Sequence, residues 1–473
     1  MEDFRSYLPV ETNRMSEHIG STDLAARVGV AREDITPPVG INARNWGAAT
    51  HDCATGVHRP LTLTALAIAV GDAPPLILIT ADLGWWKSLD DERWIRDGIA
   101  AATGLRSPHV LLCLTHTHAG PNLHRADRTR PGGELIAPYL DAVRASAAGA
   151  ATRALATLVP ARIGWRYGRC SLARNRDVPS DTDGRYLVGF NPSLPADDTL
   201  LVGRVTRVGD SRLIATLVNY ACHPTTLAWK NSLLSPDFPG AMREHVESAT
   251  AAPCLFLQGA SGDLAPAEQY TGDTAVADRH GHRLACSVLG TLDAWPDACL
   301  RPGEVVQSGA PLLEWKRHEH EVSETLSAQE IAIEFTVKNL PSEQEIQTLW
   351  AAATEGATRE RLWRKLATRR TIGEGATVSI PLWVWRLGET LLFAQPNESY
   401  SMWQTELRRH FAPRACAVIN IANGYIGYLP PRDHYERDQY SVWQTPFAEG
   451  SLEKLVLESI RAGDSILRNR LTS

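Results

Sequence analysis

The stretch L-L-C-L-T-H-T-H-A-G-P-N, residues 111–122, combines an apolar run with two histidines placed where that run ends. The apolar run over 111–114 predicts a buried strand, and residues 120–121 predict the turn that follows it. Successive side chains of an extended segment point to opposite faces, so we expect His116 and His118 on one face. Two imidazoles there can bind a metal, or a metal and a substrate. A pair of hydrogen-bonded structural histidines fits this short motif equally well.

Short apolar strands alternate with alanine-rich helical segments on both sides of this stretch. This alternation predicts an α/β (α+β mixed) fold. A hairpin around residues 209–210, together with longer crossovers, indicates a mixed β-sheet flanked by helices, with the functional site at strand ends. The predicted strands span residues 61–70, 76–81, 109–114, 201–208, 213–220, 254–258, 330–337, 377–387, 391–394 and 415–421. The predicted helices span residues 90–103, 137–158, 239–248, 275–291 and, as one charged helix, 342–368.

Most of the 473 residues are expected to form one large domain. We assign residues 1–24 to a polar N-terminal extension and residues 25–473 to the domain itself. The pattern of short apolar runs and alanine-rich segments is interrupted near residue 301, which indicates an insertion or subdomain at about 301–375. Length alone would allow further domains, but no low-complexity linker divides the chain.

Composition narrows the classes of function. A net charge of −6 and a pI near 6.2 argue against nucleic acid as a partner. The sequence has neither a signal-peptide core nor an apolar run of transmembrane length, so we expect a cytoplasmic protein without stable membrane insertion. Eight dispersed cysteines without a C-x-x-C pair indicate reduced thiols. A homo-oligomer is compatible with the sequence, but nothing in the sequence supports one.

Four further polar clusters follow apolar runs. N-Y-A-C-H-P-T-T carries His223, and F-L-Q-G-A-S-G-D carries Asp263 in a glycine-containing turn. F-A-Q-P-N-E-S-Y places Glu398 after a strand, and N-G-Y-I-G-Y places Tyr425 and Tyr428 in a loop. Two histidines, a carboxylate and one more oxygen ligand would make a zinc site with room for water. Each residue also has a structural interpretation, such as a first-turn helix charge for Glu398.

Trp85 and Trp86 lie just beyond the predicted strand 76–81, next to Asp82. The two indoles would form an aromatic wall for an apolar or ring-shaped substrate, or would simply pack in the core. Asp82 and Asp263 are candidates for supporting a metal ligand or transferring a proton. Asp263 is counted among the catalytic candidates, but no pattern in the sequence identifies the general base.

Taken in order, these clusters resemble the neutral/alkaline (non-lysosomal) ceramidase family, whose members are zinc amidohydrolases that cleave an N-acyl bond. The resemblance begins with E-D-I-T-P-P-V-G at 33–40 and G-V-H-R-P at 56–60. T-H-T-H-A-G-P at 115–121 is close to the family's T-H-T-H-S-G-P, its most specific motif. The chain therefore looks like a short, divergent member that corresponds to the family's N-terminal catalytic domain.

The resemblance also implies roles for individual residues. The zinc ligands would be His116, His223, Glu398 and Tyr428. Residues that contact or stabilise the substrate would be His118, Tyr440, Asn175 and Arg176. Zinc held in this way would lower the pKa of a bound water, and the resulting hydroxide would attack a carbonyl carbon.

The sequence departs from the family at one position of chemical interest. The family's G-D-x-S-P-N segment reads G-D-L-A-P-A here, so Ala265 stands where the family has a serine implicated in amide cleavage. Ser261, four residues earlier, is not assumed to replace it. The family's membrane-docking and immunoglobulin-like parts are also missing from the pattern. We therefore expect a zinc hydrolase acting on an amide other than ceramide; an esterase or lactonase, or a non-catalytic small-molecule-binding relative, are the alternatives.

Overall fold

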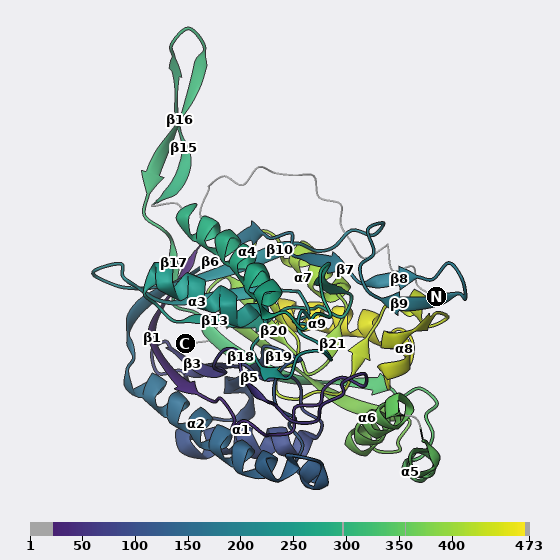
Figure 1. Cartoon of the computed structure of the whole chain (residues 1–473). Helices are drawn as coiled ribbons and strands as arrows, with labels where there is room; N and C mark the ends of the chain where they lie inside the picture. The colour runs from purple at the N-terminus through teal and green to yellow at the C-terminus, as the bar shows by residue number, and fades with distance from the viewer. Residues whose placement is uncertain (1–21, 296–297, 355, 469–473) are drawn as a thin grey trace.

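The computed structural model describes residues 22–295, 298–354 and 356–468 (Figure 1). The predicted N-terminal extension lies mostly outside these residues, and its last two positions belong to the first strand, β1 (Asp23–Asp34). The largest element is a nine-stranded sheet in which β17 pairs with β1 beside the main row of strands. In order, that row is β13 (Cys254–Gln258), β11 (Leu213–Tyr220), β10 (Thr199–Arg207), β6 (Val159–Arg169), β1, β3 (Thr62–Ala69), β4 (Leu76–Ala81) and β5 (Val110–Leu114), and β17 is Val322–Ser323.

The sheet is mixed, as the sequence predicts. The β10–β11 pair is the expected antiparallel hairpin, whereas β4 pairs with β5, and β11 with β13, in parallel. Antiparallel neighbours need only a short turn, and parallel neighbours need a crossover, here supplied by α1 and α3. The mixed α/β fold with a sheet flanked by helices is therefore confirmed.

A second sheet packs against one face of the first. It consists of β18 (Leu326–Thr336), β19 (Thr377–Leu387), β20 (Thr390–Ala394) and β22 (Cys416–Ile419). Side chains alternate along β19: Trp383 and Trp385 enter the core between the sheets, and Leu382 and Val384 enter the core on the far side. This alternation fixes the register of the strand, because a shift of one residue would exchange its two faces.

Helices cover the two outer faces, so the layers follow the order helices, sheet, sheet, helices. The helices on the larger sheet are α1 (Leu89–Thr103), α2 (Ile136–Ala156), α3 (Phe238–Thr250) and α4 (Thr274–Asp293), and those on the smaller sheet are α7 (Met402–Phe411) and α9 (Ser451–Arg468). Short strand pairs at the edges are β2 (Gly56–Val57) with β12 (Leu233–Leu234), β7 (Ala173–Asn175) with β14 (Leu264–Pro266), β21 (Glu398–Ser399) with β23 (Tyr428–Leu429), and β8 (Asp177–Pro179) with β9 (Arg185–Val188) and β24 (Asp438–Gln439). The remaining short helices are α8 (Tyr440–Gln444) and the 3-10 turns Ser107–His109, Arg125–Thr129, Gly133–Leu135 and Arg432–His434.

The segment at about 301–375, expected as an insertion, contributes three different parts. A hairpin of β15 (Cys299–Gln307) and β16 (Pro311–His318) projects from the body of the molecule (Figure 1). Strand β18 belongs to the second sheet. The predicted single helix over 342–368 is wrong: the chain forms α5 (Glu343–Ala352) and α6 (Gly356–Ile372), and Ala353 between them has an extended ψ of 128°.

The ends of strands from both sheets are joined by backbone hydrogen bonds. Asn420 N donates to Gln258 O at 2.9 Å, and Leu114 N donates to Ile421 O at 3.2 Å. His116 follows β5, His223 follows β11 and Glu398 follows β20, each within four residues of the strand end. The two sheets therefore hold one edge together, and that edge carries the candidate site. No helix among the residues described is both long and apolar enough to span a membrane.

A buried ion pair ties α3 to the end of β4. Arg243 donates to both carboxylate oxygens of Asp82, at 2.9 and 2.7 Å, and both side chains are almost fully buried. The substitution Arg243→Met is expected to lower the free energy of unfolding by about 3–5 kcal/mol, because it leaves a buried charge without a partner. Urea denaturation would measure the loss.

The matched control is Arg461→Met, which removes an exposed ion pair with Glu458. This variant should change the free energy of unfolding by less than about 1 kcal/mol. Equal, small effects of the two variants would contradict the importance of the Asp82–Arg243 pair.

Candidate metal centre

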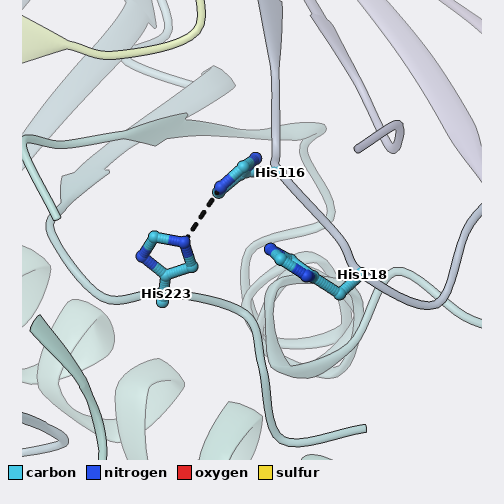
Figure 2. Close-up of side chains that lie close together, drawn as sticks. All are labelled: His116, His118 and His223. Atoms are coloured by element: carbon cyan, nitrogen blue, oxygen red, sulfur yellow. Dashed lines mark hydrogen bonds between the residues drawn. The ribbon is translucent and has the colours of Figure 1, made fainter. Parts of the chain in front are cut away.

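His116 and His118 lie close together, but by a different route from the expected one. Strand β5 ends at Leu114, and His116 has a φ of 69°, so the chain is not extended there. Its backbone N donates to Leu83 O at 2.9 Å, which fixes this left-handed turn. The centroids of the two imidazole rings are 5.0 Å apart (Figure 2). The positive φ of His116, and not the alternation of side chains along a strand, brings the two rings together.

His116 and His223 point their Nε2 atoms at each other across 3.0 Å (Figure 2). His116 Nδ1 lies 3.1 Å from Gly84 O, and His223 Nδ1 lies 2.9 Å from Ser261 O. A carbonyl oxygen can only accept, so each Nδ1 carries the proton and donates it. Burial lowers the pKa of His223 to about 4, which keeps that ring neutral at pH 7. The Nε2 atoms of the two rings therefore face each other, away from the backbone carbonyls that hold the Nδ1 atoms.

Glu398 completes this group. Its Oε2 lies 3.3 Å from His116 Nε2 and 3.0 Å from His223 Nε2. The other oxygen, Oε1, accepts a hydrogen bond from Tyr425 at 2.8 Å. Burial alone would raise the pKa of Glu398, but the neighbouring His116 and His223 hold that pKa well below its usual value. An ionised carboxylate and two imidazole nitrogens therefore converge in a buried place.

This donor set fits zinc. Tetrahedral ligands about 2.1 Å from a zinc ion lie about 3.4 Å from one another, close to the separations found here. The hydrogen bonds from Nδ1 to backbone carbonyls are the usual outer contacts of metal-binding histidines. His118 belongs to a wider group, since ligand atoms of His116, His118 and His223 all lie within 4.8 Å of one another. Two ligand sets fit this geometry: His116 and His223 with Glu398, or His116 and His223 with His118.

Tyr428 lies beside Glu398 because β21 and β23 pair in register at these two residues. Burial and the charge of Glu398 raise the pKa of the Tyr428 phenol well above its usual value. Its hydroxyl accepts a hydrogen bond from Arg176 Nη2 at 3.1 Å. Arg176 also donates to Gly262 O through Nε and Nη2, at 3.0 and 2.8 Å. Arg176 therefore fixes the position of Tyr428.

Two cavities adjoin this centre and share His118, Arg364, Tyr428, Tyr440 and Gln444. The narrow cavity, about 40 Å³, is also lined by Trp85, Trp86, Lys87, Trp363, Glu398 and Tyr425. The aromatic cavity, about 410 Å³, is also lined by Trp46, Arg176, Trp229, Tyr270 and Arg361. Trp85 and Trp86 both line the narrow cavity and both also belong to the core beneath the larger sheet, so the aromatic wall for a substrate stays a prediction.

His118 stands between the two cavities. Its ring centroid is 4.7 Å from that of Trp85 and 5.0 Å from that of Trp46. Within the described part of the chain, neither of its ring nitrogens has a hydrogen-bond partner. Two indoles thus hold the imidazole in place and leave both of its polar atoms for a ligand.

Three residues predicted for the site form hydrogen bonds or an ion pair with groups outside it. Asn175 Oδ1 accepts a hydrogen bond from Asp177 N at 3.0 Å. The Asp263 carboxylate accepts from Ser401 N and Oγ, both at 2.7 Å. Asp82 pairs with Arg243, as described above. The structure does not bring these side chains into the histidine group.

The structure shows where Ala265 and Ser261 lie relative to the histidines. Ala265 lies in β14, 1% exposed, opposite Arg174 of β7. Ser261 Oγ accepts a hydrogen bond from Gln258 Nε2 at 2.6 Å and lies 3.4 Å from His223 Nδ1. Ser261 is therefore on the outer side of the His223 ring, away from the Nε2 atoms that converge.

Sequence reasoning missed several residues of the two cavities. Lys87 follows the tryptophan pair, Arg364 lies in α6, and Trp46, Trp229 and Tyr270 come from loops. No local pattern of the sequence marks them. The high tryptophan content was the one available signal, and it did not indicate position.

Comparison with known proteins finds the fold in solved ceramidase structures. A ceramidase complexed with C2 matches with a TM-score of 0.66 and 17% identity, over 95% of this chain and 76% of that chain. The neutral ceramidase from Pseudomonas aeruginosa matches with a TM-score of 0.65 and 18% identity, over the same shares. No family model and no curated protein matches the sequence. The chain therefore has a ceramidase-like fold.

Zinc retention distinguishes the two ligand sets. After loading with zinc and dialysis, the wild-type chain is expected to keep about one zinc ion per chain. His116→Ala, His223→Ala and Glu398→Gln should each weaken binding at least about 100-fold, because each removes a converging donor. His118→Ala should keep the metal. Elemental analysis measures the zinc content of each variant, and competition with a chelator measures its zinc affinity. Zinc loss in His118→Ala together with zinc retention in Glu398→Gln would instead establish the three histidines as the ligands.

Asp263 gives a prediction for stability against pH. Burial raises its pKa to about 6, so the folded state binds a proton that the unfolded state releases near pH 4. The contribution to stability is full below about pH 4 and is lost as the pH rises through 6. Relative to Asp263→Asn, the metal-free wild type should lose about 2–3 kcal/mol of unfolding free energy between pH 4 and 7. A difference that does not change with pH in urea titrations would contradict the raised pKa.

Proposed function

We propose that this chain is a zinc-dependent hydrolase that cleaves an amide (N-acyl) bond of a small-molecule substrate other than ceramide. The observation that carries the proposal is the convergence of His116 Nε2, His223 Nε2 and Glu398 Oε2, with separations of 3.0–3.3 Å, beside a cavity that Glu398 lines. The ceramidase-like fold supports the same chemical class.

His116, His223 and Glu398 would hold the ion, with Tyr428 beside them as the fourth donor. Zinc, when bound, supplies an activated water and polarises a carbonyl oxygen. The overall reaction adds water across the C–N bond and yields a carboxylic acid and an amine. Because water is the nucleophile, the reaction needs no serine, and Ala265 is compatible with it.

The protein's own side chains would bind and orient the substrate. His118 offers two ring nitrogens that have no partner among the described residues, in a place fixed by Trp85 and Trp46. Tyr440 lies next to Tyr428, with 5.7 Å between the ring centroids, and faces both cavities. Hydrogen bonds from such preorganised groups stabilise the charge that develops on a carbonyl oxygen.

The shape and charge of the site support a compact substrate. The aromatic cavity is about 410 Å³ in volume, and Arg176, Arg361 and Arg364 stand among its aromatic walls. A two-chain lipid amide would place apolar chains beside these cations, whereas a small polar amide would pair with them. An ester or lactone would fit the same centre, since the same attack on a carbonyl carbon opens either bond.

Turnover of a substrate panel by the zinc-loaded chain tests the proposal. The panel contains compact N-acyl amines, esters, lactones and a short-chain ceramide. We expect amide hydrolysis that exceeds ceramide hydrolysis and that falls at least about 1,000-fold in kcat/KM in His116→Ala, because the metal is lost. His410→Ala is the matched control, since this histidine pairs with Asp464 at the surface of the molecule.

Each other outcome has a definite meaning. Faster hydrolysis of ceramide than of compact amides would overturn the substrate assignment. Hydrolysis of lactones or esters alone would assign the alternative bond. Binding of panel compounds without any His116-dependent turnover would favour a non-catalytic binding protein.

A further inference from the structure

The narrow cavity beside the metal centre contains an ammonium group that the mechanism above does not use. Lys87 lines this cavity together with His118 and Glu398. Its Nζ is buried, and the described residues provide no hydrogen-bond partner for it. A buried ammonium without a partner is costly, because the charge loses its hydration and gains nothing in return. Such a group calls for an acceptor from outside the chain.

The carboxylates nearest Lys87 are already engaged. Asp127 pairs with Arg130 at 3.1 Å and accepts a hydrogen bond from Asn122 at 2.5 Å. Glu360 lies 3.3 Å from Arg364 Nε and 3.6 Å from Arg130 Nη1. These acids lower the cost of burying Lys87 but do not bind its ammonium group. Burial lowers the pKa of Lys87 only to about 8, so the group keeps most of its charge at pH 7.

A second cation, Arg364, lines both cavities. Its Nη2 donates to Asn45 O at 2.7 Å, and its guanidinium lies 5.7 Å from the Trp85 ring centroid. The indole and the backbone carbonyl hold the guanidinium in place near His118 and the metal centre. Arg364 is itself paired with Glu360, at 3.3 Å, whereas Lys87 Nζ has no hydrogen-bond partner among the described residues.

The volume of the narrow cavity limits what can enter. About 40 Å³ accommodates roughly three water molecules, since each water needs about 10–15 Å³ by this measure. A carboxylate group has three heavy atoms and is of this size. The aromatic cavity, on the other side of His118, has room for a larger apolar or ring-shaped group between Trp46, Trp229 and Tyr270.

We propose that the substrate is an amide that bears a carboxylate, and that Lys87 binds this carboxylate in the narrow cavity while the aromatic cavity takes the apolar part. This inference rests on the proposed function, because it assigns a substrate class to the same centre. Charge-assisted hydrogen bonds to a buried carboxylate are among the stronger polar contacts in proteins. Lys87 is thus a residue that determines specificity.

The test compares two compounds with one skeleton. N-acetylphenylalanine carries the carboxylate, and N-acetylphenethylamine lacks it. For the zinc-loaded wild type, kcat/KM is expected to be at least about tenfold higher for the first compound. In Lys87→Met this ratio should fall at least about tenfold, and Lys87→Arg should recover part of it. Lys316→Met, on the projecting hairpin, is the matched control and should keep the wild-type ratio.

The result that overturns the inference is a ratio near one in the wild type, or a ratio that Lys87→Met leaves unchanged. Circular dichroism checks the fold of each variant, and Lys87→Gln replaces Lys87→Met if the latter fails to fold. If neither compound is hydrolysed, the proposed amide hydrolysis fails for this class, and calorimetry decides the inference separately. Binding of N-acetylphenylalanine that weakens at least about tenfold in Lys87→Met would support it; equal binding, or none, would overturn it.

Discussion

The geometry of the site depends on two imidazoles that present lone pairs to the same point. His116 and His223 each donate Nδ1–H to a backbone carbonyl, so each Nε2 is left as an acceptor. Three acceptors, two nitrogens and Glu398 Oε2, then face one another in a buried place with 3.0–3.3 Å between them. A positive charge placed among them, either a metal ion or a proton, relieves the electrostatic repulsion. The fold has to impose this arrangement, because the side chains alone would avoid it.

The two stacked sheets hold these three side chains together through the edge that the sheets share. Asn423 Oδ1 accepts from Leu112 N, and Asn423 N donates to Leu112 O, so the loop after β22 is bound to β5 in both directions. Across the same edge, Asn219 Nδ2 donates to Leu257 O and Val418 O and thereby joins the second sheet to the first. Buried amide side chains of this kind are satisfied in one register only. They fix the distance between His116, which follows β5 of the first sheet, and Glu398, which follows β20 of the second.

Much of the fold could be predicted from the sequence, and less of the site. Short apolar runs and alanine-rich segments mark strands and helices locally, which is why the mixed sheet and its hairpin were predicted correctly. Positions at strand ends left the ligand set open, and it was the resemblance to the ceramidase family that singled out His116, His223 and Glu398, which lie together in the structure. The positive φ of His116 could not be predicted, because a hydrogen bond to distant Leu83 maintains it. The ion pair between Asp82 and Arg243 could not be predicted either, because the two residues lie 161 positions apart in the sequence.

Charge explains why residues outside the motifs matter for the choice of substrate. The converging ligands contribute one negative charge, from Glu398, and a divalent ion would exceed it. Arg176, Arg364 and Lys87 stand around the same space, while Asp127 and Glu360 are taken up mainly by Arg130 and Arg364. Lys87 is therefore left without an acidic partner at hydrogen-bond distance, and a buried cation of this kind favours an anionic ligand over a neutral one of equal shape. In the function proposed above, the histidines and the glutamate would hold the metal, and α6, together with the loop after β4, would select the substrate.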